Sequence, residues 1–147
     1  MADLAAIESA IVIRLDDAEF NSDKLFALRA GASGPVRPAL RQRLLRERMP
    51  AAYVVFLNEL LDPATPLADQ GPRFAILLAA RCLRPGGNPR HGIPEHAGVF
   101  DAIDATRTLL DDFESVAGTQ MVPLAQHMLE SDDRHAIAQI TYLVKPA

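Results

Sequence analysis

The sequence predicts an α+β fold, in which a mainly antiparallel four-stranded sheet carries two long helices packed on one face. Three observations predict it. Apolar residues recur at helical spacing near 3–20 and 96–114, two strand-like apolar segments lie between them, and a polar turn divides an alternating segment at 119–144. The 147 residues, 49% hydrophobic and 23% charged, suit one globular domain spanning 1–147.

The first helix is predicted between Ala2 and Phe20. Its apolar residues recur every three or four positions, at Leu4, Ile7, Ile11, Leu15 and Ala18. Asp3 precedes the first of them, and its carboxylate can accept hydrogen bonds from the free N–H groups of the first turn. We therefore expect an amphipathic helix that begins with an aspartate cap.

Two strands are predicted in the middle of the chain, at 51–61 and 73–84, and we expect them to pair antiparallel. Before them, Pro38 suits the first turn of a short helix that ends near Met49. After them, segment 84–94 contains too many prolines and glycines for a regular helix or strand.

The second long helix is predicted between Glu95 and Phe113. One of its faces collects apolar residues and a threonine, at Val99, Ile103, Thr106, Leu110 and Phe113. The acidic residues of this segment lie mostly off that face, which indicates a helix with one buried side.

The last third of the chain, 119–144, is predicted to be a hairpin with the three-residue turn Ser131–Asp133, which pairs Glu130 with Arg134. One face then holds Val122, Leu124, Met128, Ala136, Ala138, Ile140 and Tyr142. The other face holds Pro123, His127, His135, Gln139 and Thr141.

The sequence contains no motif for catalysis, a cofactor or a metal, and we expect none of these. The histidines at 91, 96, 127 and 135 lack the spacing of converging metal ligands. The single cysteine, Cys82, lies in a predicted apolar strand, where a thiol behaves as a small hydrophobe. Neither glycine-rich phosphate-binding pattern occurs. A small enzyme that uses His127 and His135 is the alternative of a different class.

The net charge of −4 conceals three charged segments. Residues 1–24 hold six acids against two bases, 29–48 hold six arginines against one acid, and 95–114 hold six acids against one arginine. The arginines of the basic segment would not form one stripe on a helix, and the chain as a whole is acidic. Contacts with acidic protein surfaces are therefore favoured over nucleic-acid binding.

The longest apolar stretches, 51–57 and 74–80, are far shorter than the roughly 20 residues that cross a membrane. We therefore expect no membrane contact. Asp3 and Glu8 stand where a secretory signal would carry basic residues, and the single cysteine fits a reducing compartment. The sequence thus predicts a cytoplasmic location.

Several segments follow one another in a distinctive order. An acidic amphipathic helix is followed by Met-Pro-Ala-Ala-Tyr-Val-Val-Phe at 49–56 and Arg-Phe-Ala-Ile-Leu-Leu-Ala-Ala-Arg at 73–81. A helix of the form Val-Phe-Asp-Ala-Ile-Asp-Ala-Thr-Arg-Thr-Leu-Leu follows at 99–110, before the closing hairpin. This layout covers nearly the whole chain and resembles the tail terminator proteins of Mu-like long-tailed bacteriophages.

The resemblance implies a structural virion protein without catalytic residues. It implies a homo-oligomeric ring, a hexamer, that caps the head-proximal end of the tail tube and ends tube polymerisation. The implied partners are further copies of the chain, the tail tube protein and a head-completion or connector protein, while genome DNA passes through the lumen without specific binding. The protein would occupy the host cytoplasm during assembly and the virion tail afterwards. The alternative within the same class is another phage neck or tail-completion protein.

A ring needs heterologous contacts, in which one patch meets a different patch of the next subunit. The charged segments offer such contacts, although pairing within one chain is an equal alternative. The expected interface residues are Arg37, Arg41, Arg43, Arg46, Arg48, Arg90, Asp16, Asp17, Asp111 and Asp112.

Overall fold

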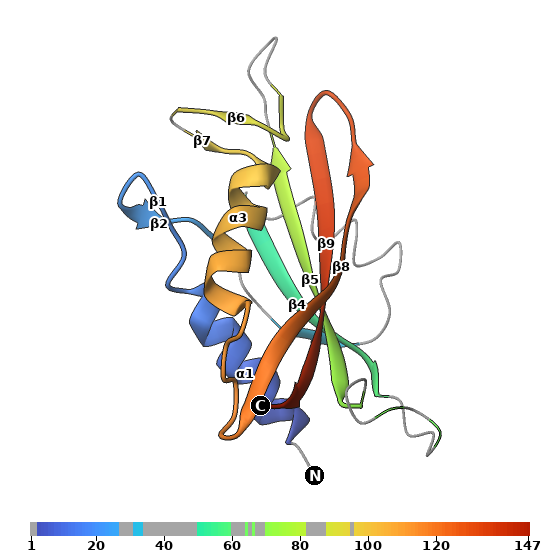
Figure 1. The fold of residues 1–147 in the computed structure, drawn as a ribbon. Helices are drawn as coiled ribbons and strands as arrows, with labels where there is room; N and C mark the ends of the chain where they lie inside the picture. The colour runs from blue at the N-terminus through green and yellow to red at the C-terminus, as the bar shows by residue number, and fades with distance from the viewer. Residues whose placement is uncertain are drawn as a thin grey trace.

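The computed structural model describes residues 3–26, 31–33, 50–59, 64, 66, 70–81, 88–94 and 96–147. It contains a sheet in the order β3-β4-β5-β9-β8, with two helices and two small two-stranded sheets (Figure 1). The sheet strands are β3 (Gly31–Ser33), β4 (Ala51–Glu59), β5 (Pro72–Arg81), β8 (Thr119–Ser131) and β9 (His135–Pro146). The predicted α+β class, with four antiparallel strands and two helices, is confirmed. The short strand β3 adds a parallel fifth member, which was not predicted.

The central strands confirm the predicted antiparallel pair. Tyr53 of β4 lies opposite Leu77 of β5, and β5 then pairs antiparallel with β9 over nine positions. The strands are described as far as Glu59 and Arg81, and residues 60–61 and 82–84 of the predicted strands lie outside the described part. The predicted short helix at 38–49 and Cys82 lie outside the described residues.

The two faces of the sheet belong to two separate clusters of buried side chains. One cluster joins alternate residues of β4, β5 and β9 to residues of both helices, α1 (Leu4–Leu15) and α3 (Val99–Leu110). The other cluster, on the opposite face, includes Tyr53, Leu77 and Ile137. The central strands are therefore buried on both faces, which explains their continuous apolar sequence.

The first helix buries the predicted residues and is shorter than predicted. Ile7, Ile11 and Leu15 are fully buried, and Asp3 Oδ1 accepts hydrogen bonds from the backbone N–H groups of Ala5 and Ala6 at 3.0 and 3.2 Å. The helix ends at Leu15 instead of extending to 20, because the chain then turns into the small hairpin of β1 (Glu19–Phe20) and β2 (Asp23–Lys24).

The second helix also keeps its predicted buried face over a shorter span. It buries Val99, Ala102, Ile103, Thr106 and Leu110. The segment before it was predicted to lack regular structure, which is wrong for its last residues: β6 (Gly92–Ile93) pairs with β7 (His96–Ala97). With 12 residues each, α1 and α3 are not the long helices of the prediction.

The register of the final hairpin corrects the prediction. Glu130 lies opposite Ile137 instead of Arg134, and the backbone N–H of Asp132 donates to the carbonyl of His135 at 2.9 Å. The register skips one residue between Pro123 and Ala125 and another between Met128 and Glu130. Each skip is a β-bulge, which shifts every later residue of β8 relative to β9.

The bulges change the predicted faces of the hairpin at its open end. Pro123 pairs with Tyr142, whereas Val122 pairs with Leu143, so these two residues of β8 lie on the faces opposite to those predicted. The predicted faces of Met128 and His127 are correct, because they pair with Ala138 and Gln139. Leu124 has no partner in the register.

Candidate functional site

Two of the predicted interface acids lie at the end of α1 and have basic partners within the chain. Lys24 Nζ lies 2.7 Å from Asp16 Oδ2, and Arg14 Nη1 lies 3.9 Å from Asp17 Oδ2. The Asp17 side chain is 66% exposed, against 32% for Asp16. Asp17 is therefore the more accessible of the two carboxylates to a partner.

A third predicted acid, Asp111, belongs to a network that joins α3 to the hairpin. Its carboxylate accepts two hydrogen bonds from Arg107 Nε, at 2.8 and 2.9 Å, and one from the hydroxyl of Tyr142 at 2.7 Å. Burial, together with the hydrogen bond to Asp111, raises the pKa of Tyr142 well above its usual value. Arg107 Nη1 also donates to Gln126 Oε1 of β8 at 3.1 Å. These bonds hold α3 against β8 and β9, so the structure gives Asp111 a role within the chain.

The neighbouring Asp112 is exposed and has a positive φ of 61°. Its backbone N–H donates to the carbonyl of Met121 at 2.9 Å, which fixes the turn between α3 and β8. The side chain is thus presented at the surface beside β8.

On the basic side, only Arg90 lies within the described residues. Its Nη1 donates to Ser131 Oγ at 2.7 Å and connects the 88–94 segment to the hairpin end. The five arginines of segment 37–48 lie outside the part of the chain that the structure describes. The predicted pairing of these arginines with acidic surfaces stays a prediction.

An uncharged surface runs along the edge strand β8, and the sequence analysis missed it. The eleven residues from Thr119 to Leu129 include no Asp, Glu, Lys or Arg. The last six of them, Leu124–Leu129, are all exposed, and we call this segment the β8 patch. Its large apolar side chains, those of Leu124, Met128 and Leu129, are 45%, 37% and 46% exposed. The signal was present in the sequence as a long interval without charge.

The two bulges of β8 coincide with the exposed leucines. Leu124 is the residue skipped between Pro123 and Ala125, and Leu129 is the residue skipped before Glu130. A bulge leaves its extra residue out of the ladder and re-aims its side chain. The irregularities of β8 therefore present leucines at the surface.

A second uncharged surface lies on the outer side of α1. Ala5, Ser9 and Ile13 are exposed and follow one another at four-residue spacing, so they lie on one face of the helix, which we call the α1 stripe. Ile13 is 70% exposed, the largest value among the exposed large hydrophobic residues of the described part. Arg14, whose side chain is 41% exposed, lies toward α3 instead, since its Nε donates to the Leu109 carbonyl at 3.1 Å.

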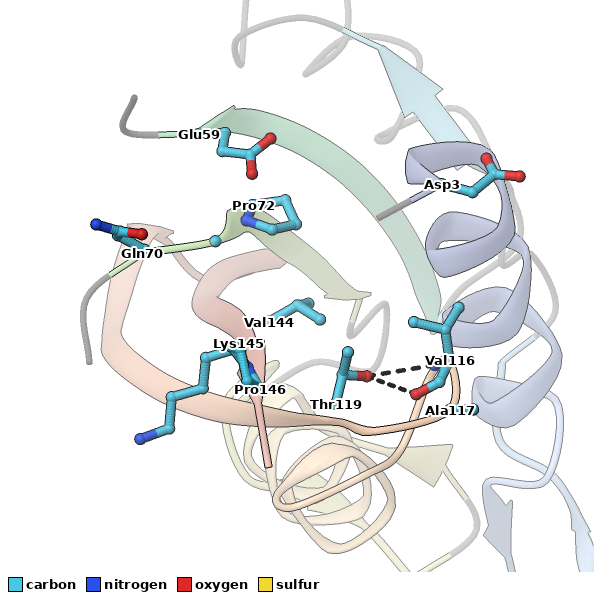
Figure 2. A pocket seen from close by; sticks show the side chains of 11 residues that line it. Asp3, Glu59, Gln70, Pro72, Val116, Ala117, Thr119, Val144, Lys145 and Pro146 are labelled. Carbon is cyan, nitrogen blue, oxygen red and sulfur yellow. Dashed lines mark hydrogen bonds between the residues drawn. The ribbon is translucent and has the colours of Figure 1, made fainter. Parts of the chain in front are cut away.

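A pocket of about 520 Å³ opens at the end of the sheet where the first and last described segments meet (Figure 2). Apolar parts of its lining come from Pro72, Val116, Val144 and Pro146. The hydroxyl of Thr119, which also lines it, donates to the Val116 carbonyl at 2.7 Å and is engaged locally. The described lining also includes the charged residues Asp3, Glu59 and Lys145, and it contains no histidine, serine or cysteine.

The remaining chemistry-bearing residues of the described segments do not converge. Among the residues that the structure describes, no group of three or more His, Cys, Asp and Glu side chains is placed to hold a metal ion. His91 packs edge-on against Phe100, and His135 Nδ1 lies 3.9 Å from Asp132. None of the described helices is long and apolar enough to span a membrane.

Comparison with known proteins identifies a family. A family model described as Bacteriophage Mu, Gp37 matches residues 3–131, which include both described helices and strands β1 to β8. The search of curated proteins found no match. Because the family match spans far more than half of the chain, this protein belongs to the Bacteriophage Mu Gp37 family.

Proposed function

We propose that this chain is the tail terminator of a Mu-like bacteriophage. Its copies form a ring, a hexamer, on the head-proximal end of the tail tube. The ring ends tube polymerisation and provides the docking surface for a head-completion or connector protein. Membership of the Mu Gp37 family and the order of the helices and strands support this role for a structural, non-catalytic virion protein.

The observation that carries the proposal is the β8 patch. The centre of a protein–protein interface is depleted of charged residues and enriched in large apolar ones. The patch has six consecutive exposed residues without Asp, Glu, Lys or Arg, and three of them are large and apolar. In the part of the chain that the structure describes, no strand pairs with the outer side of β8. Such a surface suits a chain that acts in an assembly.

The charged interface residues complete the proposal. Arginines 37, 41, 43, 46 and 48 contact acidic surfaces of a neighbouring subunit or of the tube. Among the four predicted interface acids, Asp17 and Asp112 are exposed, whereas Asp16 and Asp111 are partly buried. A basic lining of the lumen would hold DNA through its phosphates, more strongly at low salt. The arginines therefore lie away from the channel, and the genome passes without specific binding.

Tube length tests the role directly. Tails are assembled from components without this chain, and their tubes are measured by electron microscopy. We expect overlong tubes of variable length, and addition of the purified chain should restore a uniform length. Tubes of normal length that fail only to join heads would instead favour a neck or tail-completion protein.

Charge reversal tests the arginine contacts. We expect the chain with Arg41→Glu and Arg43→Glu to stay folded, because pairs between charged surface side chains generally contribute little to stability. Tail assembly should nevertheless fail, since like charges would meet across the contact. The matched control is Arg134→Glu, which reverses an exposed charge at the hairpin turn. Normal assembly together with loss of salt-sensitive DNA binding would overturn the interface role and favour nucleic-acid binding.

A further inference from the structure

We infer that neighbouring copies of this chain contact each other through the α1 stripe of one copy and the β8 patch of the next. This inference rests on the proposed ring and specifies its subunit contact. Each surface thus binds a second copy of the same chain.

α1 contains few charged residues. A helix that is apolar on all sides is normally buried on all sides. Only Glu8 and Arg14 of the twelve residues of α1 are charged. The side toward the sheet buries Ile7, Ile11 and Leu15, yet Ile13 on the outer side is 70% exposed. The outer face of α1 therefore has the composition of a covered surface.

The two surfaces lie at opposite borders of the sheet. α1 packs against β3 and β4, at one border of the sheet, whereas β8 forms the opposite border. Along the strands they also differ, because the β8 patch lies toward the hairpin turn, at the end of the molecule away from α1 (Figure 1). A heterologous contact joins two different patches, and these two surfaces, on opposite borders of the sheet, meet that requirement. A self-complementary contact would use one patch on both copies.

The α1 stripe and the β8 patch have similar chemistry. Both surfaces lack Asp, Glu, Lys and Arg, so each would leave a charged partner group desolvated without a counter-charge. Each is bordered by charge, Asp17 beyond the α1 stripe and Glu130 beyond the β8 patch. An apolar centre with a polar rim is the common anatomy of an interface. Each of the two surfaces therefore suits the other better than it suits the charged surfaces of the rest of the described chain.

The irregular backbone of β8 restricts the kind of contact that its outer side can make. Proline at 123 supplies no N–H, and the bulges at Leu124 and Leu129 interrupt the ladder. These features disfavour strand addition along the outer side of the patch, because they leave only residues 125–128 as a regular edge. The partner must then be held by side chains, and a helix face such as the α1 stripe provides them.

Complementary variants test the pairing. Ile13→Lys blocks the α1 stripe, Leu129→Lys blocks the β8 patch, and Thr108→Lys places the same charge on an exposed position of α3 as the control. Association is measured by native mass spectrometry and light scattering on the isolated chain, and by binding to purified tail tubes. Loss of the Ile13 contact alone should weaken each subunit contact roughly 10- to 30-fold. The control should associate like the parent.

Mixing distinguishes the proposed contact from a symmetric one. Each blocked variant keeps one intact surface, so Ile13→Lys mixed with Leu129→Lys should give a 1:1 complex that does not grow. A chain with both Ile13→Lys and Leu129→Glu should regain full assembly, because opposite charges then meet. If Ile13→Lys alone still assembles, or if the mixture stays monomeric, the inference is overturned.

The same experiment separates this inference from the proposed function. Heterologous contacts give a closed ring only when the rotation between copies closes, and otherwise they give a helical filament. Filaments that depend on both surfaces would support the contact and refute the terminator ring. Rings that end the tube but ignore both substitutions would support the function and overturn the contact. A parent chain that stays monomeric both alone and on tubes would overturn both.

Discussion

The network around Asp111 predicts that Tyr142→Phe destabilises the protein by an amount that depends on pH. The Tyr142 side chain is fully buried, and its hydroxyl donates to Asp111 Oδ1 at 2.7 Å. A hydrogen bond to a charged group contributes about 1.5–3 kcal/mol. Asp111 is 31% exposed and keeps both bonds from Arg107, so water can replace the phenol in part. We therefore expect a loss of about 1.5 kcal/mol at pH 7, or a fall in Tm of roughly 3–6 °C.

The pH dependence follows from the raised pKa of Tyr142. In the unfolded chain the phenol ionises near pH 10, whereas the folded chain keeps it neutral to higher pH. The stabilising contribution is thus complete below pH 10 and is lost as the pH rises above it, by about 1.4 kcal/mol per unit. The wild type and Tyr142→Phe should therefore have nearly equal stability near pH 11. Both proteins contain Tyr53, so its ionisation cancels in the comparison.

Urea denaturation at pH 7, 9, 10 and 11 measures this difference. The midpoints should differ at pH 7 and converge at pH 11, with unchanged slopes. A difference that stays constant over the whole range would show that the phenol does not gain its stability as a neutral donor to Asp111. No difference at pH 7 would show that the bond contributes nothing.

Three further substitutions probe local features by the same denaturation assay. Ser22→Gly should stabilise the protein by about 1 kcal/mol, because Ser22 has a φ of 68° that glycine adopts without strain; a loss would refute that account of the turn. Thr106→Val should also stabilise it by about 1 kcal/mol, since the fully buried Thr106 hydroxyl has no partner among the described residues; a loss would reveal a bond that the hydroxyl makes. Asp3→Ala should destabilise it by about 1 kcal/mol through loss of the α1 cap, and an unchanged midpoint would show that the helix start contributes nothing.

Local patterns predicted the buried faces of the helices well. Ile7, Ile11 and Leu15 repeat with the period of a helix, and that period alone determines which side they share. The helix ends were predicted less well, because they depend on where the chain must turn. Ala18 is buried as predicted, yet it lies beyond the end of α1. Its carbonyl accepts a hydrogen bond from the Leu25 N–H at 2.8 Å.

The hairpin shows why register could not be predicted from alternation alone. Strict alternation assigns Val122 and Leu124 to the same face, but a bulge between Pro123 and Ala125 breaks the period of two. Whether a bulge forms depends on packing across the whole sheet, which the local sequence does not encode. The contacts of Asp111 show both cases, because Arg107 lies four residues away at helical spacing, whereas Tyr142 lies 31 residues further along the chain and comes close only through the fold.

The interrupted outer side of β8 has a consequence for the protein before it meets any partner. An uninterrupted apolar edge offers its free N–H and C=O groups as a template on which identical chains stack into fibrils. Proline at 123 and the bulged leucines remove that template from the most apolar exposed part of the strand. Newly synthesised copies are therefore protected from stacking into fibrils through the backbone of this segment. Any association there has to use side chains, which limits it to surfaces whose shape and chemistry fit them.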